Sequence, residues 1–266
     1  MTSRLVLACS GAADNIAAIP RLAAEFAAEV VTLTLDIGQA GELEAIRQAA
    51  LAAGAVRAHV LDAREAFARA CITASLSDAP AADRRGHDVT GRLVAASLVE
   101  IARIEGADLV AHGGGEDDHA EIEAAARAVD PSIRVVKTGV ARAHPPHPVH
   151  ATLWERPTED GTTSMPKTEL DAPARLEIVF EAGLPVSVNG ISMSLPELIE
   201  SVSTIAGTHG VGRVTDTSGA AVHAPAAVVL QAAQEALGAA AVRASGATVC
   251  LELFRGQHRI LSAHHS

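Results

Sequence analysis

Short apolar runs alternate with segments of helical periodicity through the first half of the chain, and this alternation is the strongest constraint on its fold. The runs are rich in β-branched residues and lie at 3–8, 29–35, 56–61, 107–112 and 133–138. Helical steps of three and four follow the first run at Ile16, Ile19, Leu22 and Phe26, and looser repeats occupy 43–51, 93–104 and the region of 122. Strands that alternate with helices indicate right-handed βαβ units. We expect an α/β fold with a doubly wound, mostly parallel, Rossmann-like sheet.

The pattern changes in the second half, which predicts a smaller α+β domain. Residues 140–168 are rich in Pro, His and polar side chains, as in a linker or extended loop. After them, 175–188 is typical of a hairpin, and Ser194 with Glu197 has the spacing of a helix capping box. A helix after Pro225 and a closing hairpin complete the chain. We therefore expect a nucleotide-binding-type domain at 1–139, the linker at 140–168 and an α+β domain at 169–266.

Composition narrows the classes of function. The chain has 266 residues, a formal net charge of −11 and only 2% aromatic residues. Nucleic-acid binding relies on Lys and Arg at phosphates and on aromatic stacking, so no nucleic-acid partner is expected. No apolar run approaches the ~20 residues of a membrane span, so we expect no membrane partner. Cys9, Cys71 and Cys250 are widely spaced and form no disulfide framework, which favours a reducing, cytoplasmic setting.

The turn from the first strand into the first helix is the first candidate site. In an open parallel sheet, ligands bind at the carboxyl ends of the strands. Residues 9–15 are small and polar, and a helix N-terminus there offers free N–H groups to an anion. The alternative is an ordinary turn with Asp14 or Asn15 as the helix N-cap. Cys9 is open to two interpretations, a nucleophile or a buried small apolar residue.

Several segments in order resemble the argininosuccinate synthase family, of the N-type ATP pyrophosphatases. ACSGAADN resembles the family's pyrophosphate loop SGGxDxS, and DIGQ, DAREAFA, HGGG and TLWER resemble its next motifs. The stretch at 180–214, VHAPAAVVL and VCLELFRGQHRIL resemble its synthetase domain and terminal hairpin. The resemblance spans nearly the whole chain. It implies an adenine nucleotide alpha hydrolase-like domain followed by a synthetase-type domain.

The resemblance also implies a chemistry and a set of site residues. Family members use ATP, with Mg²⁺, to adenylate citrulline and then join it to aspartate, releasing AMP and pyrophosphate. It places nucleotide contacts at Ala8, Ser10, Gly11, Asp14, Asn15, Asp36, Gln39 and Gly113. It places substrate contacts at Thr90, Arg92, His112, Asp117, Asp118 and Glu121. No side chain is assigned as catalytic, because positioning and charge neutralisation carry this reaction.

Departures from the family pattern leave two functions open. The second Gly of the loop is Ala12, its closing hydroxyl position is Ile16, and the citrulline-binding Arg is Glu121. Isoleucine cannot donate to a phosphate, and a carboxylate repels another carboxylate. One hypothesis is an ATP-dependent, AMP-forming ligase with diverged ureido or carboxyl and amine substrates. The alternative is an inactive homologue that binds a nucleotide or a partner in a regulatory or scaffolding role. A homo-oligomer is expected, with a heteromer of a related protein as the alternative.

Two polar clusters carry weaker hypotheses. Acidic residues follow the glycines of the HGGG loop at 116–123, where carboxylates complement a helix dipole. A divalent-metal site, or a pocket for an amine, is the functional alternative. His144, His147 and His150 in the linker are typical of a solvated segment. We assign no metal site.

Overall fold

The computed structural model describes most of the chain as two compact units, which we treat separately. The described residues are 3–39, 43–75, 86–114, 116–139, 152–157, 172–215, 221–238 and 246–265. The first unit is built from the described parts of 1–37, 41–63 and 87–145. The second takes those of 38–40, 64–86 and 146–266. Most of the predicted linker at 140–168, with His144, His147 and His150, lies outside the described residues.

The first unit contains a five-stranded parallel sheet. Its strands are β1 (Ser3–Ala8), β2 (Ala28–Asp36), β3 (Arg57–Asp62), β4 (Leu109–His112) and β5 (Arg134–Lys137). The strand order is β3-β2-β1-β4-β5, and every neighbouring pair is parallel. The predicted fold class is therefore confirmed, and each predicted strand run of the first half is a strand.

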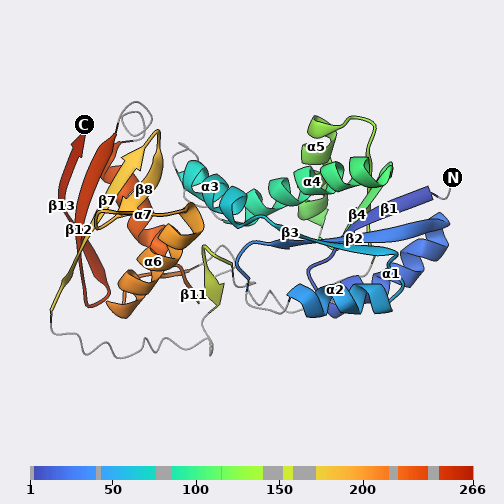
Figure 1. Ribbon diagram of the computed structural model, residues 1–266, viewed down its shortest axis with the longest axis horizontal. Coiled ribbons are helices and arrows are strands. Elements are labelled where there is room, and N and C mark those ends of the chain that lie inside the picture. The colour runs from blue at the N-terminus through green and yellow to red at the C-terminus, as the bar shows by residue number, and fades with distance from the viewer. Residues whose placement is uncertain are drawn as a thin grey trace. The chain divides into compact units, whose positions relative to one another are not determined.

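Helices cover both faces of this sheet (Figure 1). They are α1 (Ala13–Phe26), α2 (Leu43–Ala52), α4 (Gly86–Glu105) and α5 (Glu116–Val129). Alternate residues of β1 point to opposite faces. Leu5 and Leu7 pack with α1 and α2 in one core, whereas Val6 packs with α4 and α5 in the other. Both cores are completely shielded from solvent at these strand positions.

The strand order fixes where the chain changes direction across the sheet. From β1 the order runs to β2 and β3 on one side and to β4 and β5 on the other. The topological switch point therefore lies between β1 and β4. Loops that leave the carboxyl ends of these two strands diverge there and leave a crevice in open α/β folds.

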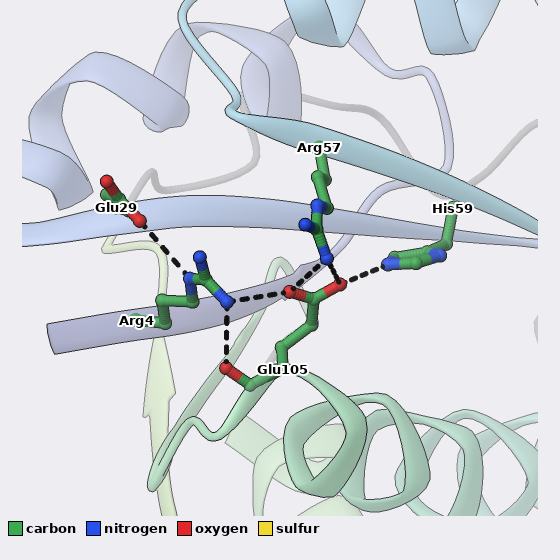
Figure 2. Close-up of polar contacts among 5 residues, drawn as sticks. All are labelled: Arg4, Glu29, Arg57, His59 and Glu105. Carbon is green, nitrogen blue, oxygen red and sulfur yellow. Dashed lines mark hydrogen bonds and ion pairs between the residues drawn. The ribbon is translucent and has the colours of Figure 1, made fainter. Parts of the chain in front are cut away.

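A network of charged side chains occupies the opposite, amino edge of the same sheet (Figure 2). The carboxylate of Glu105, the last residue of α4, is fully buried and accepts bonds from Arg4 at 3.1 Å and from Arg57 at 3.1 Å. His59 lies 2.8 Å from its Oε1, and Arg4 also pairs with Glu29 at 3.2 Å. Burial, the largest influence, raises the pKa of the Glu105 carboxyl, but bonds and charge from His59 and Arg57 outweigh it and hold that pKa below its ordinary value.

The second unit contains two antiparallel sheets. The larger has the order β13-β12-β7-β8-β9, and the smaller has the order β10-β11-β6. Their strands are β6 (Arg156–Pro157), β7 (Ala174–Glu181), β8 (Leu184–Val188), β9 (Ile191–Ser192), β10 (Arg213–Thr215), β11 (Ala221–His223), β12 (Ala247–Phe254) and β13 (Gln257–His265). Both predicted hairpins are confirmed, as β7–β8 and β12–β13.

Three helices pack in this second unit. They are α3 (Arg64–Ser75), α6 (Leu195–Thr208) and α7 (Pro225–Leu237). Helices α6 and α7 pack on each other and on strands of the larger sheet, and α3 contacts both helices. The predicted capping box is confirmed, since Ser194 donates to the Glu197 carboxylate from its N–H at 2.9 Å and its hydroxyl at 2.7 Å. Helix α3 was not predicted from periodicity. Among the described helices, none is long and apolar enough to cross a membrane.

Candidate functional site

Two bonds to β2 fix the chain as it leaves β1. Cys9 donates its N–H to Leu33 O at 2.8 Å, and the buried Thr34 hydroxyl donates to Cys9 O at 2.9 Å. Ala8, predicted as a nucleotide contact, is the last residue of β1 and pairs with Leu33. The first predicted loop therefore starts from a rigid strand end.

Gly11 gives this loop its shape. Its φ of 82° lies in the left-handed region, and a Cβ there would lie 2.6 Å from the Cγ1 of Ile46 in α2. Only glycine fits both conditions without strain. Sequence reasoning did not single out Ile46, since contact between α2 and this loop follows from the fold and not from a motif.

Helix α1 begins directly after the loop, at the carboxyl edge of the sheet. Its N-cap is Ala12, without a side-chain capping bond. The alternative prediction of Asp14 or Asn15 as N-cap is therefore wrong, because both lie inside the first turn. A short aliphatic N-cap leaves the first N–H groups of the helix without a side-chain partner from the cap. Such groups, with the helix dipole, favour an anion.

Cys9 lies beside this loop and is buried, with 3% of its surface exposed. Burial is the main influence on its thiol and raises the pKa, although a bond from the Gly11 N–H lowers it. A raised pKa disfavours the thiolate, which is the nucleophilic form. The geometry fits the interpretation of Cys9 as a small buried residue.

The loop after β4 is organised around two histidines. His112 is buried, and its Nδ1 accepts the N–H of Gly114 at 3.1 Å. The proton of a neutral His112 therefore lies on Nε2, which donates to His119 Nδ1 at 2.9 Å. The rings stack with their centroids 5.2 Å apart. This pairing of a strand end with the first turns of α5 was not predicted, because no motif rule covers a seven-residue His spacing.

The loops after β1 and β4 meet at Asn15. Its Nδ2 donates to Ser10 Oγ at 3.2 Å. A Cβ built on Gly113 would overlap the Asn15 Oδ1 and lie 3.2 Å from its Cγ. Ser10 is exposed, and a hydroxyl that accepts one bond can still donate its own hydrogen to a ligand. Four predicted nucleotide-side residues, Ser10, Gly11, Asn15 and Gly113, thus come together at the switch point, and Asp14 lies half-buried in the same helix turn.

The residues after β2 divide between the two units. Asp36 ends β2 in the first unit and is half-buried. Gln39 belongs to the second unit together with Gly38. Gly38 has a φ of 80°, and a Cβ on it would lie 2.8 Å from the Cβ of Leu153. The predicted DIGQ turn therefore requires glycine at its third position.

The predicted substrate residues lie on α4 and α5. Thr90 and Arg92 stand within α4, and Arg92 Nε lies 3.7 Å from the Oε1 of Glu121. A Cβ on Gly91 would lie 3.3 Å from the same carboxyl group. Glu121 therefore lies against the N-terminal half of α4. Asp117 and Asp118 belong to the first turn of α5, as predicted for the acidic cluster, but their side chains lie outside the described part of the structure.

The loops at this edge of the sheet offer groups that can bind an anion. Within the described ranges, no group of three or more His, Cys, Asp or Glu side chains is placed to hold a metal ion. The loop offers a hydroxyl, a carboxamide, two glycines and a helix N-terminus, which together can bind phosphate oxygens. The geometry of these loops can position a ligand and offer it hydrogen bonds.

Family models match both halves of the chain. The arginosuccinate synthase N-terminal HUP domain matches residues 4–143, and the arginosuccinate synthase C-terminal domain matches residues 150–249. The chain belongs to the argininosuccinate synthase family. The resemblance found in the sequence is therefore confirmed over both parts of the fold.

Individual relatives agree with this membership. Argininosuccinate synthase of Streptococcus suis is 33% identical over 79% of this chain and 63% of that protein. The argininosuccinate synthase of Symbiobacterium thermophilum is 34% identical over 79% of this chain and 63% of that protein. The argininosuccinate synthase of Dictyoglomus turgidum is 31% identical over 88% of this chain and 70% of that protein. The chain thus spans about 63% of the length of the first relatives. A solved NAD+ synthetase from Burkholderia pseudomallei, with a TM-score of 0.32, 19% identity and coverage of 48% of this chain and 66% of that one, is too dissimilar to carry an argument.

Proposed function

We propose that the first unit binds ATP at its switch point, with the phosphates against the loop at 9–12 and the N-terminus of α1. The contact of Asn15 with both Ser10 and Gly113 carries this proposal, because it joins the loops after β1 and β4 at one point. A side chain at position 11 or 113 would collide with Ile46 or Asn15, so glycine at both positions lets these loops pack closely. Membership of a family whose relatives are named argininosuccinate synthases supports ATP as the ligand.

On this proposal the chain is an ATP-dependent carbon–nitrogen ligase that forms AMP and pyrophosphate. Ser10 and the N-terminus of α1 hold the phosphates, and the loop after β4 fixes the approach of the acceptor. The acceptor, a ureido or carboxyl compound, and the amine differ from citrulline and aspartate. Glu121 supports this difference, because a carboxylate paired with Arg92 at 3.7 Å stands where the family pattern has a citrulline-binding Arg.

Magnesium fits this site as a companion of the nucleotide. Mg²⁺ is usually held by substrate phosphates and waters with one or two carboxylates, and it neutralises phosphate charge. Half-buried Asp14 and Asp36 are two carboxylates of this chain near the strand ends.

Ile16 favours a second candidate, a member that binds a nucleotide without turnover. It stands one turn into α1 and packs against the core formed with α2. An aliphatic side chain there gives no donor to a transferring phosphate. A nucleotide-binding regulatory or scaffolding protein would need the loop but not this donor.

Calorimetric and thermal-shift titrations with ATP and AMP, with and without Mg²⁺, test the site. ATP at one hundred times its Kd should raise the free energy of unfolding by about 2.7 kcal/mol. Ser10→Ala should weaken ATP several-fold, whereas Ser262→Ala in the second unit should leave the affinity unchanged. No stabilisation by either nucleotide would overturn ATP binding.

Activity separates the two candidates once binding is established. Pyrophosphate release in the presence of ureido or carboxyl acceptors and amines supports the ligase. Citrulline with aspartate should give no argininosuccinate; turnover near ~1 s⁻¹, the low end of ordinary enzymes, would contradict the diverged substrates. ATP binding without pyrophosphate release for any acceptor favours the non-catalytic candidate.

A further inference from the structure

The loop after β4 is held at two points of the first unit. One is the close approach of Gly113 to the Asn15 carboxamide. The other is the histidine pair, His112 at the end of β4 and His119 in α5, whose facing nitrogens lie 2.9 Å apart. His112 is 2% exposed, and its Nδ1 accepts the N–H of Gly114 at 3.1 Å. A change in the histidine pair therefore acts on the residue next to Gly113.

The two bonds of the histidine pair admit one arrangement of protons. A ring nitrogen that accepts a hydrogen bond carries no proton, and a neutral imidazole carries its proton on the other nitrogen. His112 Nδ1 accepts the Gly114 N–H, so the proton of this ring lies on Nε2 and points at His119 Nδ1. His119 then carries its own proton on Nε2. Both rings are therefore neutral when the loop is held.

One added proton breaks this arrangement. On His119 the proton would occupy Nδ1, and two N–H groups would then face each other across 2.9 Å. On His112 the proton would occupy Nδ1 and displace the N–H of Gly114. Histidine is the side chain that ordinarily changes charge between about pH 5 and pH 8. The shape of the loop after β4 therefore depends on the protonation of the histidine pair.

The surroundings of His112 disfavour a charge on its ring. The side chain is buried, and burial penalises the charged form of an imidazole. Lys137 of β5 is the register partner of His112, so both side chains leave the sheet on the same face, where a like charge adds to the penalty. From α1, Asp14 precedes the Asn15 that approaches this loop and carries the opposite charge. Burial and Lys137 act directly on the ring, so His112 stays neutral.

The surroundings of His119 tolerate a charge. Its ring is half-buried, and carboxylates gather on the same helix at Glu116, Asp117, Asp118, Glu121 and Glu123. Glu121 pairs with Arg92 of α4 at 3.7 Å, and Glu123 pairs with Arg127 at 2.9 Å. The positive end of the helix dipole opposes a cation here, but carboxylates in the first turn offset it. An added proton therefore goes to His119 and not to His112.

We propose that His119 is a positioning residue of the nucleotide site, which through His112 holds the loop after β4 in its ligand-binding shape only while both rings are neutral. This inference rests on the proposed binding of ATP at the switch point. Protonation of His119 separates the rings, releases the Gly114 N–H and loosens the contact of the loop with Asn15. The affinity for ATP should therefore fall on acidification. Direct attraction between a cationic His119 and the phosphates would have the opposite sign.

Calorimetric titrations of the full chain with ATP and Mg²⁺, at about pH 8 and about pH 5.5, compare it with two variants. His119→Gln keeps an oxygen that accepts the His112 Nε2–H but takes no proton, whereas His119→Ala has no acceptor. At the higher pH, His119→Gln should bind within about twofold of the unmodified chain, and His119→Ala about fivefold more weakly. At the lower pH, the unmodified chain should bind about fivefold more weakly than His119→Gln. Comparison at one pH cancels the titration of ATP itself.

A matched control makes the same replacement far from the loop. His264→Gln, at an exposed position of β13 in the second unit, should follow the unmodified chain at both pH values. If the unmodified chain and His119→Gln lose affinity equally on acidification, or if the unmodified chain binds more tightly at the lower pH, the proposal is overturned and ATP binding stands.

Nuclear magnetic resonance of the chain labelled with ¹⁵N-histidine tests the pair without ATP. At about pH 8 both rings should carry their proton on Nε2, and the Gly114 amide should be protected from hydrogen exchange. Acidification should protonate His119 and remove that protection, which should persist in His119→Gln. A proton on His112 Nδ1 at the higher pH would overturn the proposal. If no variant binds ATP, the nucleotide site and the role of His119 toward it are both wrong, and the ring signals still decide whether the pair holds the loop.

Discussion

The two edges of the parallel sheet use polar residues in opposite ways. At the amino edge, the buried carboxylate of Glu105 is surrounded by Arg4, Arg57 and His59 at 2.8–3.1 Å. At the carboxyl edge, an exposed Ser10 and small residues surround a helix N-terminus, with one internal bond of 3.2 Å from Asn15. Figure 2 shows how completely the charges at the amino edge satisfy one another.

Helix α4 connects these two edges and shows why they differ. Helices in such folds run antiparallel to the strands, so the start of α4 lies toward the carboxyl edge and Glu105 ends it at the amino edge. A carboxylate at a helix C-terminus opposes the helix dipole. The ion pairs with Arg4 and Arg57 offset this unfavourable position of the Glu105 carboxylate. We therefore infer that the network at the amino edge stabilises the fold. The carboxyl edge keeps hydrogen-bonding capacity for a ligand.

The largest effect on stability is expected from a variant that disrupts the Glu105 network at the amino edge. Glu105→Gln removes the charge that two guanidinium groups share, and loss of one partner from a buried pair is costly. Because Arg4 and Arg57 are partly exposed, we expect a loss of about 2–3 kcal/mol in the free energy of unfolding. Urea denaturation measures it. Glu100→Gln, an exposed position on the same helix, should change stability by less than about 0.5 kcal/mol.

The affinity for ATP gives the matching control. The folded Glu105→Gln protein should bind ATP as the unmodified chain does, because the network lies at the other edge. A stable variant, or one that loses ATP affinity while folded, would contradict the division of roles between the edges.

A second prediction disturbs the carboxyl edge. Gly113→Ala places a methyl group on the Asn15 carboxamide, which must leave Ser10. We expect about tenfold weaker ATP binding and a stability loss of about 1 kcal/mol or less. In the Asn15→Ala background the methyl group has space, so Gly113→Ala should have little further effect. Unchanged ATP affinity of the single variant would show that this contact does not shape the site.

The sequence predicted the parallel sheet well because its central strands β1, β2 and β4 are mostly buried apolar runs. Val6 and Leu5 each fill a different core, so continuous apolar character was the correct signal. Helix α3 was missed because its buried side includes Ala68 and Cys71, which weaken the apolar periodicity. Ile104 was taken as part of a helical face, yet it is 65% exposed.

Some contacts at the two edges could not be predicted from the sequence, because they join segments that are distant along the chain. Asn15 was a candidate from the loop motif, but its contact with Gly113 depends on β1 and β4 being neighbours. The Glu105 network depends on the same strand order, which brings Arg4 and Arg57 to one carboxylate. Neither arrangement has a local sequence signal, because each requires the register of the sheet.

A third prediction concerns the pH dependence of the stability that the amino edge contributes. The pKa of Glu105 is lower in the folded protein than its ordinary value of 4.5, so folding favours the charged form. This contribution is fully present above pH 4.5 and is lost as the pH falls through the folded pKa. The stability difference between the unmodified chain and Glu105→Gln should therefore narrow below pH 4.5. Urea denaturation from pH 7 to pH 3 measures it, and a difference that is constant or grows on acidification would contradict it.

The smallest expected effect tests whether the charge of Glu121 is fixed beside the N-terminal half of α4, toward the carboxyl edge of the sheet. Gly91→Ala should gain about 0.5–1 kcal/mol from helix propensity. The new Cβ would lie 3.3 Å from the Glu121 carboxyl, whose side chain is 31% exposed and can turn outward. We therefore expect a net gain of about 0.5 kcal/mol or less, and the full gain in the Glu121→Ala background. Destabilisation in the first background with stabilisation in the second would mean that Arg92 holds the carboxylate rigidly, as a fixed charge that selects against anionic substrates. Destabilisation in both backgrounds would contradict the contact itself.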